Sequence, residues 1–259
     1  MNLSKLFDLS GKVAVVTGST KGIGKAIVEA LAAHGAGVVV SSRKAEACDK
    51  VAAGIRAAGG QAIAQPCNIS NEPEVVALFE RTHAAYGKID VLVLNAAVNP
   101  YYGPGADIPD SAFDKIMHVN IKMNLKMCGM AAKEMRGRKD GAIVIVSSIG
   151  GYRASTVIGA YCISKAADMQ LARNLAAEYG PDNIRVNCIA PGLVKTDFAR
   201  ALYENPQIAE KRKLETPLRR LGEPEDLAGI AVYLASPAGS WTTGQTFVVD
   251  GGVCAGAGH

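Results

Sequence analysis

The sequence predicts an α/β protein with one parallel sheet of seven strands and helices on both faces, for two reasons. First, short runs rich in β-branched residues recur, at 12–17, 37–42, 61–66, 90–95, 142–148, 183–190 and 245–250. Second, each of the first six runs is followed by a longer segment of helical pattern. Repeated strand–helix units of this kind build a doubly wound sheet. No Pro- or Ser-rich linker interrupts them, so we expect a single domain over residues 1–259.

One segment breaks this alternation. Residues 195–225 are rich in charge and contain Pro206 and Pro217. A long connection that departs from the regular pattern of a compact domain is often functional. We therefore expect a substrate lid at about 195–225.

Composition argues against several classes of protein. The net charge of +4 is spread along the chain, which gives little support for nucleic-acid binding. No apolar run is long enough to span a bilayer, and the N-terminus MNLSKLFDLSGK lacks the apolar segment of a secretory signal. We therefore expect a cytoplasmic protein with no membrane partner. The six cysteines show no CxxC spacing and HExxH does not occur, so we expect buried thiols and no metal site.

A glycine-rich turn, TGSTKGIG, follows the first predicted strand at Thr17. Glycines between a strand and a helix let the backbone approach a pyrophosphate, whose charge the helix N-terminus stabilises. The spacing is GxxxGxG rather than GxGxxG, and by itself it is compatible with an ordinary turn. Its place in the first strand–helix unit predicts a Rossmann-type domain. The expected cofactor contacts in this turn are Gly18, Ser19, Lys21, Gly22, Ile23 and Gly24.

The end of the second predicted strand indicates which dinucleotide binds. An NAD enzyme places a carboxylate there, on the ribose hydroxyls, whereas this chain has Ser42 and Arg43. An arginine can bind the 2′-phosphate of NADP, and Lys21 can add a second positive charge. Either basic residue alone could be an ordinary surface charge. Their joint placement favours NADP(H) over NAD(H).

A phenol and an ammonium group stand four residues apart in the helical segment 158–180, as Tyr161 and Lys165 of the motif YCISK. On a helix they lie one turn apart on the same face and can serve one site. A tyrosine with an ordinary pKa near ~10 is a weak base at neutral pH. A positive charge on Lys165 would favour its phenolate form.

Together these motifs resemble the short-chain dehydrogenase/reductase family in its single-domain form. TGxxxGIG, LNAA after the fourth strand, Ser148, YCISK and APGLVKT occur in the family's order, from about residue 10 to Gly252. The stretches VVVSSRK, NAAVNP and RVNCIAPGLVKT are most similar to NADPH-dependent carbonyl reductases of the dehydrogenase/reductase subgroup. The resemblance implies an enzyme that interconverts a small carbonyl compound and a secondary alcohol by hydride transfer.

The resemblance also implies four catalytic residues. Tyr161 would be the general acid/base, Lys165 would favour its ionisation and hold the nicotinamide ribose, and Ser148 would orient the substrate oxygen. Asn120 resembles the asparagine that kinks its helix and holds a water beside the lysine. Rival candidates for the last two roles are Ser147 and Asn124, although Ser148 and Asn120 match the family pattern.

Further cofactor contacts follow from the same matching. They are Ser42, Arg43, Asn68, Ile69, Asn95, Ala96, Pro191, Gly192, Val194 and Thr196, together with Tyr161 and Lys165. Asn68 stands where the family usually has Asp, so slightly weaker adenine contacts are expected. As in this family, we expect a homotetramer.

The substrate is less well defined by the sequence. Apolar and aromatic side chains fall on the loops expected around the nicotinamide: Tyr101, Tyr102, Tyr152, Ile158, Phe198, Leu202 and Tyr203. They could bind an apolar or aromatic carbonyl compound, or pack the lid or an interface between subunits. We expect Trp241 to be a packing residue. Two other functions stay open, namely a reductase of 3-oxoacyl thioesters, which shares every catalytic residue, and a non-catalytic NADP(H)-binding module.

Overall fold

Seven strands form one parallel sheet in the computed structural model, which describes residues 3–256. They are β1 (Val13–Thr17), β2 (Gly37–Ser41), β3 (Gln61–Ala64), β4 (Val91–Leu94), β5 (Gly141–Val146), β6 (Ile184–Pro191) and β7 (Thr246–Val249). Their order is β3-β2-β1-β4-β5-β6-β7, and every neighbouring pair is parallel. The order reverses between β1 and β4, which is the topological switch point of a Rossmann-type sheet. The predicted α/β fold is confirmed.

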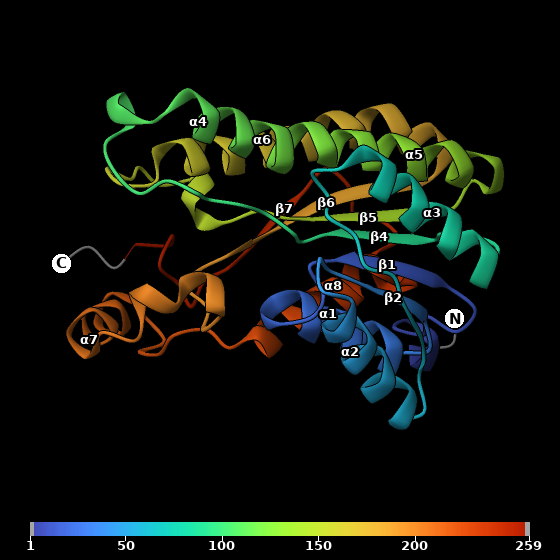
Figure 1. Cartoon of the computed structure of the whole chain (residues 1–259). Coiled ribbons are helices and arrows are strands. Elements are labelled where there is room, and N and C mark those ends of the chain that lie inside the picture. Colours follow the sequence, from blue (N-terminus) through green and yellow to red (C-terminus); the bar gives the residue numbers. More distant parts are fainter. Residues whose placement is uncertain (1–2, 257–259) are drawn as a thin grey trace.

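Helices cover both faces of the sheet (Figure 1). One face carries α1 (Gly22–Ala33), α2 (Ala45–Ala57) and α8 (Ala228–Ala235). The other carries α3 (Glu72–Tyr86), α4 (Asp110–Met117), α5 (Met123–Arg138) and α6 (Gly159–Tyr179). Short 3-10 turns are η1 (Leu3–Lys5), η2 (Gly105–Asp107), η4 (Ile149–Gly151), η5 (Gly180–Asp182), η7 (Pro224–Leu227) and η8 (Pro237–Gly239).

The strands are apolar throughout because both faces of the sheet are buried. Successive side chains of a strand point to opposite faces. On β1, Val15 packs in the core beneath α3, α5 and α6, whereas Ala14 and Val16 pack in the core beneath α1, α2 and α8. The β-branched runs of the sequence are therefore the signature of a sheet with two cores.

Two irregular segments lie near the expected site. A π-helical turn, His118–Lys122, joins α4 to α5, and such turns are frequent at functional sites. The segment from 195 to 225 contains a 3-10 turn, η6 (Asp197–Leu202), and α7 (Pro206–Glu215). A parallel bridge between Val194 and Gly222 ties the two ends of this segment together, and α7 projects from the helical layers beside the C-terminal segment (Figure 1). Within residues 3–256, no helix is both long and apolar enough to cross a membrane.

Candidate active site

Most of the predicted site residues follow the carboxyl ends of parallel strands, which meet at one edge of the sheet. The glycine turn follows β1, Ser42 and Arg43 follow β2, Asn68 and Ile69 follow β3, Asn95 and Ala96 follow β4, Ser148 follows β5, and the Pro191–Thr196 segment closes β6. The helix α6 adds Tyr161 and Lys165, and the π-helical turn adds Asn120. The fold thus brings segments distant in sequence to one edge.

The glycine turn has a backbone that larger residues would strain. Gly18 and Gly22 have φ values of +66° and +54°, in the left-handed region. A Cβ on Gly24, in the first turn of α1, would lie 3.0 Å from the carbonyl carbon of Gly18 and closer still to its oxygen. The loop therefore packs tightly against the N-terminus of a twelve-residue helix. This arrangement fits the pyrophosphate of a dinucleotide.

The ends of β1 and β4 are joined by hydrogen bonds at the switch point. The side-chain amide of Asn95 donates to the carbonyl oxygens of Thr17 (3.0 Å) and Gly18 (3.1 Å). The Thr17 hydroxyl accepts from the backbone amides of Asn95 (3.0 Å) and Ala96 (3.1 Å). Sequence reasoning did not single out Thr17, although a polar residue that ends an apolar strand was a visible signal.

The basic residues near the expected adenine ribose differ in their partners. Lys21 pairs with Asp197 at 2.8 Å, and both side chains are exposed. Arg43 is also exposed, and within residues 3–256 it has no ion-pair partner. Asn68 uses its side-chain oxygen locally, because this atom accepts from the hydroxyl of Ser70 at 2.8 Å. Arg43 is therefore the more available of the two predicted cations.

Lys165 is a buried residue of α6, and Tyr161, one turn earlier on the same helix, is partly buried. The Lys165 ammonium lies 5.6 Å from the centre of the Tyr161 ring. It donates to the carbonyl oxygen of Val146 (3.0 Å) and to the carboxylate of Asp168 (2.9 Å). Burial raises the pKa of Tyr161 above its ordinary value, and Lys165 and a hydrogen bond with Ser148 offset this only in part. Lys165 thus lowers the pKa of Tyr161, as expected, but the loss of hydration raises this pKa by more.

The two serines at the end of β5 have different surroundings. Ser147 is buried, and its hydroxyl donates to the backbone carbonyl of Lys165 at 2.7 Å. Ser148 is less buried and accepts from the amide of Gly150 at 3.0 Å; it also lies close enough to Tyr161 to lower the pKa of the phenol. Ser148 therefore caps a turn and also stands beside the phenol.

Asn120 is fully buried in the π-helical turn. Its side-chain oxygen accepts from the amide of Val98 at 2.9 Å, and its amide donates to the Val98 carbonyl and to the Ser164 hydroxyl, both at 3.1 Å. Asn120 thus ties the loop after β4 to α6, and the irregular helix expected there is present. Within residues 3–256 it makes no direct hydrogen bond to Lys165.

A buried carboxylate near the lysine was missed by sequence reasoning. Asp168 has no exposed surface and pairs with Lys165. Its other oxygen accepts from the side-chain amide of Asn124 at 3.2 Å, a residue considered only as a rival to Asn120. Residues three apart lie on the same face of a helix, so the spacing of Lys165 and Asp168 could have predicted that the two meet.

The first turn of the 195–225 segment lies over the site. The Phe198 ring centre is 5.8 Å from that of Tyr161. The Thr196 methyl carbon stands 2.9 Å from the position that a Cβ on Gly22 would take. This segment therefore contacts both α6 and the glycine turn. The expectation for Trp241 is wrong, because its side chain is 99% exposed.

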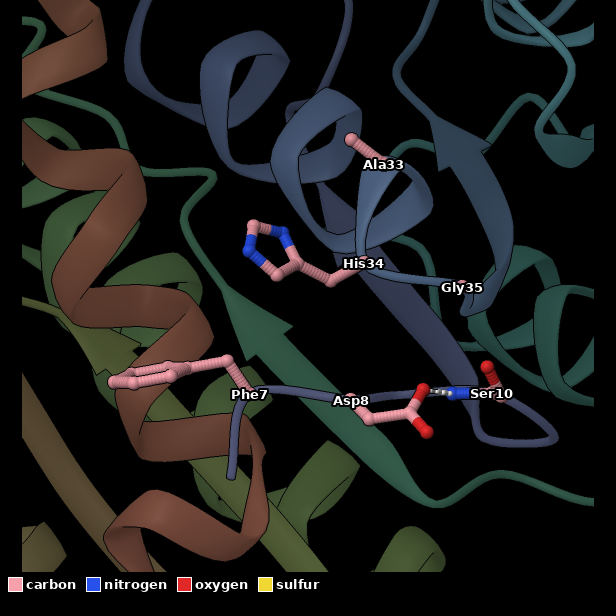
Figure 2. A pocket seen from close by; sticks show the side chains of 6 residues that line it. All are labelled: Phe7, Asp8, Ser10, Ala33, His34 and Gly35. Atoms are coloured by element: carbon pink, nitrogen blue, oxygen red, sulfur yellow. Dashed lines mark hydrogen bonds between the residues drawn. The ribbon is translucent and has the colours of Figure 1, made fainter. Parts of the chain in front are cut away.

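A shallow hollow lies elsewhere on the surface (Figure 2). It is lined by Phe7, Asp8, Ser10, Ala33, His34 and Gly35. These residues precede β1 and β2, at the amino ends of the strands and away from the candidate site. Asp8 accepts from the Ser10 amide at 2.9 Å, so its charge serves a local turn. Within residues 3–256, no group of His, Cys, Asp or Glu side chains is arranged to hold a metal ion.

Comparison with known proteins places the chain in a family. The family model described as enoyl-(acyl carrier protein) reductase matches residues 18–254. Dehydrogenase/reductase SDR family member 4 from Sus scrofa is 44% identical over 244 residues, which cover 94% of this chain and 88% of that protein. The chain belongs to the short-chain dehydrogenase/reductase family. As a short-chain dehydrogenase/reductase, it is an oxidoreductase that binds NAD(P) and acts on the carbonyl or alcohol group of a small molecule.

Solved structures of other short-chain dehydrogenases/reductases agree with this fold. A 7α-hydroxysteroid dehydrogenase complexed with NADH and 7-oxo glycochenodeoxycholic acid is 39% identical with a TM-score of 0.93, covering 97% of this chain and 98% of that one. A 3-oxoacyl (acyl-carrier-protein) reductase from Agrobacterium tumefaciens with NADP bound is 34% identical with a TM-score of 0.90, covering 97% of each chain. The two relatives thus hold different cofactors.

Proposed function

We propose that this short-chain dehydrogenase/reductase interconverts a carbonyl compound and a secondary alcohol with NADP(H), and that Tyr161 is its general acid/base. One observation carries the proposal. Tyr161 lies beside Ser148 and one helical turn from the buried Lys165, at the edge of the sheet that also holds the glycine turn. An acid, an orienting hydroxyl and a positive charge are the groups that carbonyl reduction needs.

Each side chain has a defined task in this proposal. The bound cofactor supplies a hydride in reduction and accepts one in oxidation. Ser148 orients the substrate oxygen, and Tyr161 gives its proton to that oxygen in reduction or takes it in oxidation. Because burial raises the pKa of Tyr161, the phenol is protonated at neutral pH and ready to act as the acid. Asn120 supports the site through Ser164 and the loop after β4.

The cofactor would lie along the carboxyl edge of the sheet. The glycine turn would hold the pyrophosphate, and Lys165 would hold the nicotinamide ribose. The other contacts expected from the sequence fall on the surrounding loops: Ser19, Ile23, Ser42, Asn68, Ile69, Asn95, Ala96, Pro191, Gly192, Val194 and Thr196. Arg43 would bind the 2′-phosphate because it is exposed and unpaired within residues 3–256, whereas Lys21 shares its charge with Asp197.

The segment 195–225 would be the substrate lid of one domain spanning the chain. Phe198 supports this proposal, because it places an aromatic ring against Tyr161 from the first turn of the segment. A ring in that place favours an apolar or aromatic carbonyl substrate. We expect a homotetramer, since the 99% exposure of Trp241 and 40% exposure of Val248 leave apolar surface beside β7. Light scattering that shows a stable monomer would contradict the tetramer.

NADPH consumption with a panel of substrates tests the proposed function. Turnover of aromatic ketones well above that of an acetoacetyl thioester would support the proposal. The reverse order would favour a 3-oxoacyl thioester reductase, the activity named for the Agrobacterium relative. NADPH binding without reduction of any ketone, aldehyde, diketone or thioester would favour a non-catalytic binding module.

A further inference from the structure

A buried carboxylate next to the catalytic lysine has no task in the mechanism above. Asp168 is 0% exposed and Lys165 is 2% exposed, and their charged groups are 2.9 Å apart. Removing two charges from water costs several kcal/mol per ion, and the pair is kept only where the geometry is good. Simple burial of a helix face would be served better by an apolar side chain. The carboxylate therefore requires an explanation beyond packing.

The position of Asp168 is fixed from two sides. Asn124 on α5 donates to one carboxylate oxygen at 3.2 Å and to the backbone carbonyl of Asn120 at 2.6 Å. Lys165 donates to the other oxygen and to the Val146 carbonyl at the end of β5. A continuous buried network thus runs from the π-helical turn through Asp168 to Lys165. The ammonium group is held between a strand end and the Asp168 carboxylate. Burial raises the pKa of Asp168, whereas Lys165 and the Asn124 amide favour its charged form.

The charge of Asp168 affects the protonation state of Tyr161. A lysine beside a tyrosine favours the phenolate, but a carboxylate that pairs with the lysine cancels much of its field. Burial would lower the pKa of Lys165, yet Asp168 and Tyr161 raise it overall, so the ammonium stays charged. Burial is the main cause of the raised pKa of Tyr161, and the charge of Asp168 adds to it. Asp168 therefore favours the neutral phenol.

Within residues 3–256, the other titratable groups near the pair include three thiols and the exposed Arg173 of α6, whose charge acts on Cys188. Cys162 lies on α6, Cys128 packs from α5, and Cys188 on β6 places its sulfur 3.3 Å from the carbonyl oxygen of Asp168. Burial raises the pKa of all three thiols, so they are neutral over the working range of an enzyme. Asp168 is thus the carboxylate that sets the local charge balance.

We propose that Asp168 is a positioning residue that acts as the buried counter-ion of Lys165, keeps Tyr161 protonated and extends to higher pH the range in which the site reduces carbonyl compounds. This proposal rests on the proposed function, because it assumes that Tyr161 is the acid. It explains why a charged side chain stands in an apolar helix. It also gives Asn124 a task, namely to orient the carboxylate toward Lys165.

The pH dependence of turnover tests the proposal. Oxidation of an alcohol with NADP⁺ needs the phenolate, so its kcat/KM rises with pH. Reduction of a ketone with NADPH needs the phenol, so its kcat/KM falls at high pH. This rise and this fall are the two limbs of the pH dependence. Asp168→Asn keeps the shape of the side chain and removes its charge. Because the Val146 carbonyl and the Tyr161 phenolate still favour the charged form of Lys165, we expect both pH limbs to move to lower pH by roughly one unit, with an NADPH Kd within about twofold of the wild type. Asp168→Glu, which restores the charge, should bring the limbs back toward the wild-type position.

Glu178→Gln is the matched control, because it removes a carboxylate from the exposed end of the same helix; its limbs should not move. If Asp168→Asn does not fold, Asp168→Ser tests the same shift with a smaller uncharged side chain. Unchanged limbs, or limbs moved to higher pH, would overturn the counter-ion role while turnover itself remained. Absence of turnover in the wild type would instead overturn the proposed function.

Discussion

The substitution Gly24→Ala tests whether the glycine turn and the start of α1 are packed as tightly as a dinucleotide site requires. The new Cβ would lie 3.0 Å from the carbonyl carbon of Gly18 and within a shorter distance of its oxygen. Because backbone atoms cannot rotate away as side chains do, the turn or the helix must move. Overpacking of this kind costs about 1–3 kcal/mol. The helix gains back roughly 0.5–1 kcal/mol, the usual advantage of alanine over glycine.

Gly54→Ala separates these two effects. Gly54 lies in α2, is exposed, and a Cβ there meets nothing within 4 Å. Gly54→Ala should therefore gain only the stability that alanine gives to a helix. The difference in stability between the two variants then measures the cost of overpacking at Gly24. For a protein of this size, about 1–3 kcal/mol corresponds to a difference in Tm of roughly 2–12 °C.

Calorimetry with NADPH completes the test. Displacement of Gly18 should weaken NADPH binding by about tenfold, equivalent to about 1.4 kcal/mol, and Gly54→Ala should leave it unchanged. Equal Tm values and equal NADPH affinities for the two variants would refute the assignment of this turn as the pyrophosphate site.

Three further substitutions or conditions test the rest of the site. Arg43→Asp should weaken NADPH binding at least tenfold relative to NADH, whereas Lys50→Asp, which changes an exposed cation of α2, should not. An unchanged preference would assign the discrimination to Lys21 or to Lys44, the exposed cation that follows Arg43 at the start of α2. Phe198→Ala should raise the KM for an aromatic ketone several-fold without altering NADPH affinity, and an unchanged KM would contradict the lid. Ketone reduction should stay constant through neutral pH and decline only in alkaline solution, because the pKa of Tyr161 is raised; a decline below neutrality would contradict that assignment.

The sheet was predictable because both of its faces are buried. Each strand then appears as a short β-branched run, and the observed strands lie within two residues of the predicted ends, as in β3 and β5. The run predicted to end at Pro66 ends at Ala64, since a proline cannot donate to the strand ladder. Motif spacing also placed Ser148, Tyr161 and Lys165 near one another, because it reflects positions on a single strand end and a single helix.

Contacts between distant segments were not predictable in the same way. Asn124 meets Asp168 across 44 residues, and Lys21 meets Asp197 across 176. Such pairs depend on how helices and loops pack, and the local sequence pattern around each residue does not predict them. The exposure of Trp241 has the same origin, since hydrophobic character alone does not say which surface a side chain occupies. Asp168 was within reach of sequence reasoning, because it shares a helix face with Lys165.

The most direct test of the account is the turnover of Tyr161→Phe. This change deletes only the hydroxyl that is proposed to carry the proton. We expect kcat for NADPH-dependent ketone reduction to fall by a factor of about 10²–10⁴, while the NADPH Kd stays within about twofold of the wild type. Turnover close to that of the wild type, with NADPH bound equally well, would contradict the role of Tyr161 and the mechanism built on it.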